Sequence, residues 1–169
     1  IFPEAPKHAE IDLMQPLQRQ RLPQSIGFKR LTFSFDDGVR QDVRLLEILN
    51  RYRLKATFNL NSALMGKDMT EARMEKRSVP AFTADEIPDV YHGHEVATHT
   101  RTHRDLTKLS GHEIISEIEG DRLTLSDVCG YAVIGMAYPG EGCNHDSRVL
   151  SLIRAKSKIQ YARTVQCSG

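Results

Sequence analysis

The sequence of 169 residues contains no tryptophan and only three cysteines, Cys129, Cys143 and Cys167. An odd number of cysteines without a C-x-x-C pair gives no support for a structural zinc module or a dense disulfide framework. Long apolar runs are also lacking, because stretches such as residues 131–137 are far shorter than the roughly 20 residues that a membrane-spanning helix needs. We therefore expect no segment of this sequence to span a bilayer.

The sequence also lacks an excess of charge of either sign. It has 23 lysines and arginines against 22 aspartates and glutamates, a formal net charge of +1, and the basic residues are spread along the chain. Non-specific binding to nucleic acid depends on concentrated positive charge, so the sequence predicts no nucleic-acid partner. The remaining composition, 40% hydrophobic and 27% charged, is typical of a globular chain long enough for one domain with a core.

Proline is concentrated at the start of the chain. Four prolines interrupt residues 1–27, and this composition is typical of an arm or a wrapping loop rather than of periodic structure. We interpret residues 1–27 as an N-terminal extension and residues 28–169 as the compact domain that carries the function.

Within the compact domain, short apolar segments alternate with amphipathic or capped ones. The apolar segments predict strands at 31–35, 56–60, 95–98, 132–138 and 159–165. Apolar spacing and capping-box patterns predict helices at 41–53, after Thr83, after Ser110 and at 147–155. This alternation predicts an α/β fold with a mostly parallel sheet, and a barrel-like arrangement of this kind places its site at the C-terminal ends of the strands.

Residues 61–82 lack clear periodicity and contain Gly66 and Pro80. We interpret them as a long excursion that packs on the rim of the domain, with the covering of a site as the alternative.

Two pairs of residues at predicted strand ends carry groups that bind metals or move protons. Asp36 and Asp37 end the first strand, and Gly38 permits the sharp turn that directs both carboxylates out of the sheet. His99 and His103 follow the third strand, and imidazoles four residues apart can face one point across a single turn. One carboxylate and two imidazoles make a three-ligand metal site, whose open coordination positions are typical of catalysis.

Three runs of the sequence resemble, in order, the first three motifs of the polysaccharide deacetylases, which are the NodB-homology carbohydrate esterases. The runs are SFDDG at 34–38, GHEVATHT-x-x-H at 93–103 and AYP at 137–139. Secondary likenesses at 55–58 and 161–164 extend the resemblance over roughly residues 30–165. The resemblance implies a deformed (β/α) barrel with fewer than eight strands, which binds one divalent metal ion and hydrolyses N-acetyl groups on a sugar polymer.

By motif position, the resemblance implies that Asp37, His99 and His103 are the metal ligands and that Asp36 is the general base. It implies zinc as the metal, with cobalt, manganese or nickel as alternatives. A divalent ion polarises the poorly electrophilic amide carbonyl and lowers the pKa of a bound water toward about 7, and a neighbouring carboxylate can then take the proton. The two aspartates can hold these different roles only where their environments differ.

The third motif departs from the family pattern. Where the family commonly has an arginine that steadies the base, this sequence has Ala137, and Gly140 stands where the family has a tyrosine. A backbone amide at Gly140 can still face the developing oxyanion. Arg163, at the end of the last strand, is expected either to replace the missing arginine or to pair with a surface carboxylate. Tyr138 and Pro139 are expected to contact the substrate.

The C-terminal region differs from the family as well, because it has no Leu-x-His segment of the kind that supplies the family's general acid. We expect that the C-terminal part of the domain is missing from this sequence, with His145 acting as the acid, or an impaired domain, as the alternatives. The residue that protonates the leaving amine therefore stays unassigned.

Together these observations predict a metal-dependent carbohydrate deacetylase, a hydrolase of a carbon–nitrogen bond that is not a peptide bond. The expected partner is an acetylated sugar or oligosaccharide. An O-acetyl esterase, a hydrolase of another carbon–nitrogen bond and a catalytically impaired sugar-binding domain are the alternatives. Aromatic residues make up only 7% of the sequence, and long polysaccharide grooves stack sugars on aromatic rings, so a short oligosaccharide is as good a candidate as a polymer.

Overall fold

The computed structural model of the chain describes residues 31–70, 78–140, 142 and 144–165. The predicted N-terminal extension and its boundary with the compact domain lie outside the described residues, so that division stays a prediction. Within the described part of the chain, no helix is both long and apolar enough to cross a membrane.

Five strands form one parallel sheet whose spatial order is the same as the order along the chain. The strands are β1 (Ser34–Asp36), β2 (Thr57–Leu60), β3 (Glu95–Thr98), β4 (Gly135–Ala137) and β5 (Tyr161–Arg163). Each strand is added on the same side of the preceding one, without the reversal of order that marks a doubly wound sheet. This is the arrangement of a barrel wall, and the predicted barrel-like α/β class is confirmed.

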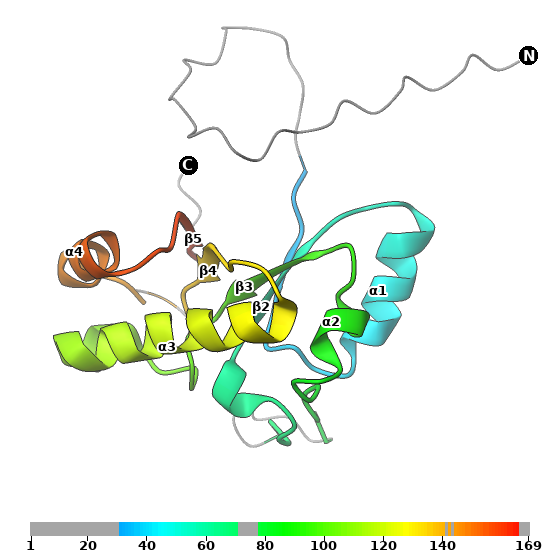
Figure 1. The fold of residues 1–169 in the computed structure, drawn as a ribbon, viewed down its shortest axis with the longest axis horizontal. Helices are drawn as coiled ribbons and strands as arrows, with labels where there is room; N and C mark the ends of the chain where they lie inside the picture. Colours follow the sequence, from blue (N-terminus) through cyan, green and yellow to red (C-terminus); the bar gives the residue numbers. More distant parts are fainter. Residues whose placement is uncertain (1–30, 71–77, 141, 143, 166–169) are drawn as a thin grey trace, which may run out of the picture. The chain divides into compact units, whose positions relative to one another are not determined.

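Helices connect the strands, because parallel neighbours need a crossover. The α-helices are α1 (Asp42–Arg51), α2 (Ile87–Val90), α3 (Gly111–Cys129) and α4 (Ser147–Lys156), and η1 (Ser62–Leu64) and η2 (Leu106–Lys108) are short 3₁₀ helices. Figure 1 shows the long α3 running across the sheet, with α4 beside one of its ends and α2 beside the other. The helices predicted at 41–53 and 147–155 are confirmed as α1 and α4, with small differences at their ends.

The helix predicted after Ser110 is α3, and both of its ends are capped. The Glu113 amide donates to the Ser110 hydroxyl, and the Ser110 amide donates to the Glu113 carboxylate at 2.9 Å. At the other end, Gly130 has a left-handed conformation with φ of 73°, and its amide donates to the Ser126 carbonyl. These contacts satisfy main-chain groups that a helix leaves unpaired at its ends, so they define where α3 begins and ends.

The capping-box pattern at Thr83 has a different outcome. The Glu86 carboxylate accepts hydrogen bonds from both the amide and the hydroxyl of Thr83, at 2.8 and 2.9 Å, so the hydroxyl acts as a donor instead of a cap. The helix α2 begins only at Ile87 and ends at Val90, and Gly93, with φ of 79°, then turns the chain into β3. The predicted helix is present, but it is short.

Two apolar clusters hold the helices against the sheet. One includes Phe58 of β2, Val96 of β3 and Leu125 of α3, together with residues of α1 and α2. The other includes Met136 of β4 and Ile118 of α3, together with residues of α4. Because α3 contributes to both clusters, its position is fixed relative to β3 and β4, two of the strands that lead into the candidate site.

Of the excursion predicted at 61–82, the structure describes residues 61–70 and 78–82, and these contact the turn that follows β1. An isolated bridge joins Val39 to Ala81, and these two residues form a small apolar cluster with Met69 and Val79. Since Val39 comes directly after Gly38, the described part of the excursion contacts the chain next to the two adjacent aspartates.

Three strands are shorter than their apolar segments predict. β1 begins at Ser34 rather than at residue 31, β4 spans Gly135–Ala137, and β5 spans Tyr161–Arg163. Among the described residues, β1 and β5 are the edges of the sheet and pair on one side only, and Leu31 is 79% exposed. Apolar character alone overestimates the length of a strand that has one partner. Apolar residues indicate that a segment is buried, and a buried segment need not be paired as a strand along its whole length.

Candidate metal centre

The C-terminal ends of all five strands bring a group to one region. β1 ends at Asp36, β2 carries Asn59 opposite Asp36, and His99 follows β3. β4 ends at Ala137, which is paired in register with Arg163 of β5. Parallel strands present their carboxyl ends at one edge of the sheet, so residues that are distant in sequence meet there.

Asp37, His99 and His103 form the cluster that the sequence predicts. Each residue offers one ligand atom, and the three atoms lie within 4.8 Å of one another. The Nε2 atoms of His99 and His103 are 3.9 and 3.8 Å from Asp37 Oδ1. Ligands bound to zinc at about 2.0–2.2 Å in tetrahedral geometry are roughly 3.3–3.6 Å apart, so these atoms fit around one divalent ion after a small adjustment.

The cluster is closed on one side and open on the other. The side chain of His99 is 3% exposed, whereas the side chains of His103 and Asp36 are 35% and 33% exposed. Three such groups with one accessible side would leave coordination positions open on a bound ion, which is the arrangement of catalytic zinc sites.

His99 is oriented by a main-chain group of the neighbouring strand. Its Nδ1 lies 2.9 Å from the Ala137 carbonyl oxygen. With the proton on Nδ1, the lone pair of Nε2 is left for a metal ion, and this is how ligating imidazoles are usually held. Burial lowers the pKa of His99, against the charge of Asp36 and the hydrogen bond to Ala137, and burial thereby favours the neutral ring.

Two of the three cluster residues lie on strained backbone. Asp37 and His103 have φ of 83° and 60°, and Thr100, between the histidines, has φ of 66°. Residues other than glycine rarely adopt these values, which persist only where surrounding contacts hold them. The turn at Gly38 is equally demanding, because a Cβ atom there would lie 2.7 Å from Leu60 Cδ2.

Asp36 has different partners from Asp37. Arg163 Nη2 donates to both carboxylate oxygens of Asp36, at 2.5 and 2.6 Å, and the Asn59 side-chain amide donates to Asp36 Oδ1 at 2.8 Å. Asp36 Oδ2 also lies 3.9 Å from His99 Nε2. The structure therefore brings Arg163 to the general-base candidate, and its charge-assisted hydrogen bonds orient this carboxylate beside the cluster.

Residues 99–103, which we call the histidine loop, carry both histidines of the cluster. Asn61, directly after β2, donates from its side-chain amide to the carbonyl oxygens of His99 and Thr100, at 2.6 and 2.7 Å. Asn61 is 2% exposed, so these two hydrogen bonds are shielded from water. These hydrogen bonds hold the start of the loop against the chain that follows β2, whereas His99 Nδ1 contacts β4 on the other side.

Two buried carboxylates of α3 contact the same region. Glu117 accepts hydrogen bonds from the amide and the hydroxyl of Thr102, at 2.8 and 2.6 Å. Asp121 accepts hydrogen bonds from the amide of Ser62, at 2.6 Å, and from the hydroxyl of Thr98, the residue that precedes the loop. Burial raises the pKa of Asp121 to about 6, against the hydrogen bonds from Ser62 and Thr98.

The structure places the other predicted residues in a turn after β4. Tyr138 is 2% exposed, and its ring lies in the second apolar cluster and stacks on His145, with 4.9 Å between ring centroids. Pro139 is buried as well. Gly140 is exposed, has φ of 79°, and accepts a hydrogen bond from Asn144 at 3.2 Å. The side chains of Tyr138 and Pro139 therefore support the turn at Gly140 from within the core.

A cleft of about 450 Å³ lies beside β1 and the residues that follow it. It is lined by Ser34, Phe35, Asp36, Val39, Gln41, Asp42 and Val79. Asp36 belongs to this lining and also lies 3.9 Å from His99 Nε2. The cleft thus offers room for a chemical group next to the general-base candidate.

Four supporting residues escape the sequence analysis: Asn59, Asn61, Glu117 and Asp121. The two asparagines occupy alternate positions at the end of an apolar strand. Polar residues with a spacing of two lie on one face of the sheet, and this pattern could have identified them from the sequence. Glu117 and Asp121 lie four residues apart in α3, on the buried side that also carries Ile118. Acidic residues on such a face indicate a specific polar partner, because they are almost never buried unpaired.

A family model described as polysaccharide deacetylase matches residues 25–156 of this chain. Among curated proteins, the peptidoglycan-N-acetylglucosamine deacetylase PgdA of Listeria monocytogenes is 26% identical over 154 residues, which cover 82% of this chain. The chain spans only 30% of the length of that relative.

Several solved structures have a similar fold. A polysaccharide deacetylase from Bacillus cereus has a TM-score of 0.62 at 22% identity, covering 78% of this chain and 38% of that chain. The deacetylase PplD of Streptococcus pyogenes, in complex with acetate, has a TM-score of 0.60 at 18% identity, covering 85% and 68%. A pseudoenzyme of the CE4 family from Bacillus anthracis has a TM-score of 0.54 at 20% identity, covering 78% and 42%. At these identities the similarity shows the fold alone.

Proposed function

This chain belongs to the polysaccharide deacetylase family, and we propose that it is a metal-dependent hydrolase that removes N-acetyl groups from an acetylated glycan. One observation carries the proposal: Asp37, His99 and His103 meet beside Asp36, which Arg163 holds by two hydrogen bonds. The curated relative from Listeria is named for N-acetylglucosamine in peptidoglycan, so N-acetylglucosamine within such a glycan is the first substrate to test.

In this proposal Asp37, His99 and His103 hold one divalent ion, zinc in the first place and cobalt, manganese or nickel as alternatives. Two imidazoles and one carboxylate are donors that suit these ions. Bound there, the ion would polarise the acetamide carbonyl and lower the pKa of the water that attacks it. Burial of His99 favours the neutral ring that metal binding requires.

Asp36 is proposed as the general base that takes a proton from the attacking water. Its side chain is a third exposed and lies beside the cluster, so water has access to it. Arg163 and Asn59 bind this carboxylate from the protein side and fix its orientation. The remaining lone pairs of the carboxylate can accept the proton. General-base catalysis requires first of all that the carboxylate lie within hydrogen-bond reach of the water.

The backbone amide of Gly140 is proposed as the donor to the developing oxyanion. Gly140 follows β4 at the edge of the sheet where the cluster lies, in a turn that is exposed to solvent. A backbone donor fixed before the reaction needs no reorganisation when charge develops on the carbonyl oxygen. Tyr138 and Pro139 contribute to substrate binding through the shape of this turn, since their side chains are buried.

The test is elemental analysis of the purified protein together with acetate release from N-acetylglucosamine oligomers, with and without added zinc, cobalt or manganese. We expect one bound metal ion per chain and acetate release that depends on the metal. Bound metal without acetate release from any N-acetylated sugar would contradict deacetylation. A protein that binds none of these metals would contradict the site itself.

A second candidate is a domain that binds acetylated sugars without hydrolysing them. It is favoured by one observation, that a pseudoenzyme is among the solved structures with a similar fold. Asp36 argues for hydrolysis, because a site that only binds has no need of a carboxylate held beside the ligands by an arginine. Adding O-acetylated sugars to the same assay distinguishes an O-acetyl esterase from the N-deacetylase and from the sugar-binding domain.

A further inference from the structure

We infer that two buried carboxylates of α3, Glu117 and Asp121, set the metal affinity of the candidate centre by holding the histidine loop in its strained conformation. The inference rests on the proposed function, because it concerns the metal site that the proposal assigns to Asp37, His99 and His103. It adds positioning residues that lie outside the three sequence motifs.

Glu117 holds the second half of the histidine loop. Both of its carboxylate oxygens are used, one by the Thr102 amide and one by the Thr102 hydroxyl. Its backbone carbonyl also accepts a hydrogen bond from the Arg101 amide at 3.0 Å. One residue of α3 therefore binds two consecutive residues of the loop, directly before His103.

Asp121 holds the entrance to the loop. One of its carboxylate oxygens binds the Thr98 hydroxyl, and that hydroxyl accepts a hydrogen bond from the Thr100 amide at 3.2 Å. The other oxygen binds the Ser62 amide after β2. Asp121 is 0% exposed, so a single buried carboxylate joins α3, the chain after β2 and the first residues of the loop.

These contacts matter for metal binding because the backbone of the histidine loop is strained. Thr100 and His103 have positive φ, and residues other than glycine keep such unfavourable conformations only where neighbouring groups hold them. Without that enforcement the loop would relax, and the two imidazoles would no longer meet at one point. A metal ion would then have to reorder its own ligands on binding, so its affinity would fall.

The helix that carries the two carboxylates is itself well fixed. Glu117 and Asp121 are four residues apart, so they lie on one face of α3, one turn from each other. Capping contacts at Ser110 and Gly130 define the ends of this helix, and both apolar clusters include residues of it. Because α3 is fixed in this way, the hydrogen bonds of Glu117 and Asp121 also fix the histidine loop.

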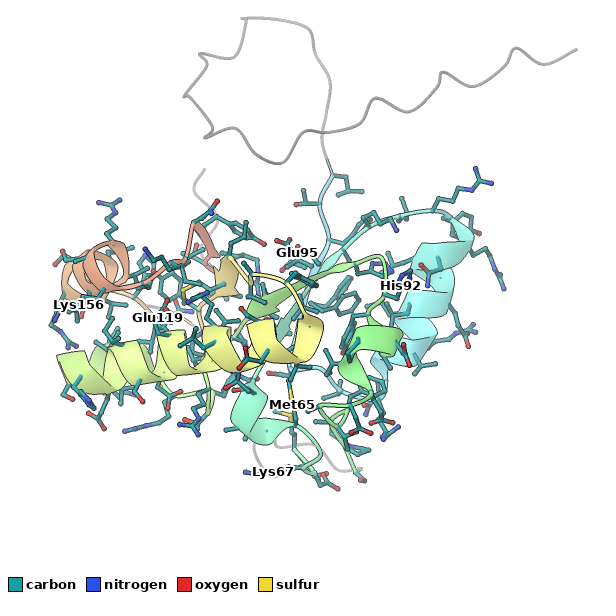
Figure 2. The ribbon with its side chains drawn as sticks, in the orientation of Figure 1. Met65, Lys67, His92, Glu95, Glu119 and Lys156 are labelled. Carbon is teal, nitrogen blue, oxygen red and sulfur yellow. The ribbon has the colours of Figure 1, made fainter. Side chains whose placement is uncertain are left out.

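The experiment is a titration of the metal-free protein with zinc in competition with a chromophoric chelator. For Glu117→Met and Asp121→Ala we expect zinc affinity to fall by about 10–100-fold, the effect typical of removing the groups that orient metal ligands. Glu117→Gln keeps an acceptor for the Thr102 amide and is expected to retain most of the affinity. The matched control is Glu119→Met, because Glu119, labelled in Figure 2, lies on α3 but binds Arg122 and Lys158 instead of the loop.

A second pair of variants tests the same anchor from the exposed side of the loop. Thr102→Val removes one hydrogen bond to Glu117 and is expected to weaken zinc binding, whereas Thr102→Ser retains the hydroxyl and should bind as the unmodified protein does. The absorption spectrum of the cobalt-loaded protein is the second readout, since a merely destabilising change would leave the ligand geometry and the spectrum unaltered.

Zinc affinities of Glu117→Met and Thr102→Val within twofold of the unmodified protein would overturn the inference, and so would an equal loss in Glu119→Met. Zinc affinity is measured without catalysis. A protein that binds zinc but releases no acetate would therefore contradict the proposed function, and the titrations would still test the role of α3. Failure of the unmodified protein to bind zinc or cobalt would overturn both.

Discussion

The two adjacent aspartates at the end of β1 are neighbours in sequence with separate sets of partners. Asp36 receives hydrogen bonds from Arg163 and Asn59, whereas Asp37 faces the two histidines at 3.8 and 3.9 Å. Asp37 is also the more buried of the two, with a side chain 10% exposed against 33% for Asp36. This difference in environment is what the proposed roles require, with Asp37 as metal ligand and Asp36 as general base.

Substitutions at the two aspartates should therefore separate metal binding from turnover. We expect Asp37→Ala to abolish metal binding, because it removes one of three ligands. Asp36→Asn should retain the metal and lose acetate release, because an amide cannot accept the proton. Metal content and acetate release measured on both variants decide the matter, and equal loss of metal in both would contradict the assignment.

Arg163 provides a second prediction for a single residue. Arg163→Gln should retain bound metal and lower kcat by about 100-fold, since the general base loses the group that orients it. The control is Arg154→Gln, which changes an exposed arginine of α4 and should leave kcat unchanged. Unchanged turnover in Arg163→Gln would show that its contacts with Asp36 are dispensable.

How far the site could be predicted from sequence depends on whether a residue acts through type and spacing or through contact. The resemblance to the family motif indicates Asp37 as the third candidate ligand, whereas His99 and His103 were predictable as candidate ligands from their residue type and their spacing of four residues. Asn59 and Glu117 were not, because an amide or a carboxylate becomes a support only when the fold brings its partner to it. These partners come from other strands and loops.

Among the elements, α3 connects local sequence signals to the site. Its capping box at Ser110 is predicted from the sequence and present in the structure. The start of α3 depends on that box, and the helix in turn carries the two carboxylates that bind the histidine loop.

A change at the cap should therefore lower stability by an amount typical of helix ends. We expect Ser110→Ala to lower the free energy of unfolding by about 1 kcal/mol, because the Glu113 amide loses its acceptor. Urea unfolding monitored by circular dichroism measures the change. Ser116→Ala makes the same substitution at an exposed position inside α3 and should have little effect or a slightly stabilising one.

A second element-scale link joins α1, β2 and β3 through His94. Its Nδ1 accepts a hydrogen bond from the Ala56 amide at 3.3 Å, and its Nε2 lies 3.1 Å from the side-chain oxygen of Asn50 in α1. Protonation of Nδ1 would remove the first of these bonds. Burial, with a smaller effect of the Lys55 charge, lowers the pKa of His94 below its ordinary value.

This lowered pKa predicts a loss of stability in acid. The folded protein favours neutral His94, so its contribution is fully present above the unfolded pKa of about 6.5 and is lost as the pH falls through the lower folded value. We expect the free energy of unfolding of metal-free protein to fall less between pH 7 and pH 5 in His94→Gln than in the unmodified chain. Equal pH dependence in the two proteins would contradict this role.

The elements themselves were predictable to different degrees. The strand at 95–98 and the helix at 147–155 were predicted almost as the structure has them, because each has clear apolar periodicity and a defined start. β1 and β5 were overestimated, since a pattern of residue types does not show which strands are at the edge of a sheet. The order of the strands likewise follows from long-range pairing that no local pattern contains.

At the scale of the whole molecule, the candidate centre joins the turn after β1 to the loop after β3, and α3 supports that loop. A ligand that binds the folded chain and not the unfolded one stabilises the fold by mass action. Free zinc at a hundredfold excess over its dissociation constant should therefore raise the free energy of unfolding by about 2.7 kcal/mol.

Thermal unfolding with zinc and with a chelator measures this stabilisation. We expect the midpoint to rise with zinc in the unmodified protein and to stay the same in Asp37→Ala, which lacks a ligand. A rise of equal size in the variant would place the stabilising ion elsewhere in the molecule.

The pairing of Arg163 with Asp36 also bears on how the molecule assembles. These two residues are 127 positions apart, so their contact closes a loop that spans most of the described chain. Loop closure costs more entropy as the loop lengthens, and contacts of high sequence separation are slow to form. Asp37 and the histidines are closer along the chain, in the turn after β1 and the loop after β3. A folding chain would thus bring Asp37 and the two histidines together before Arg163 reaches Asp36, so the proposed metal site would form before the proposed base is oriented.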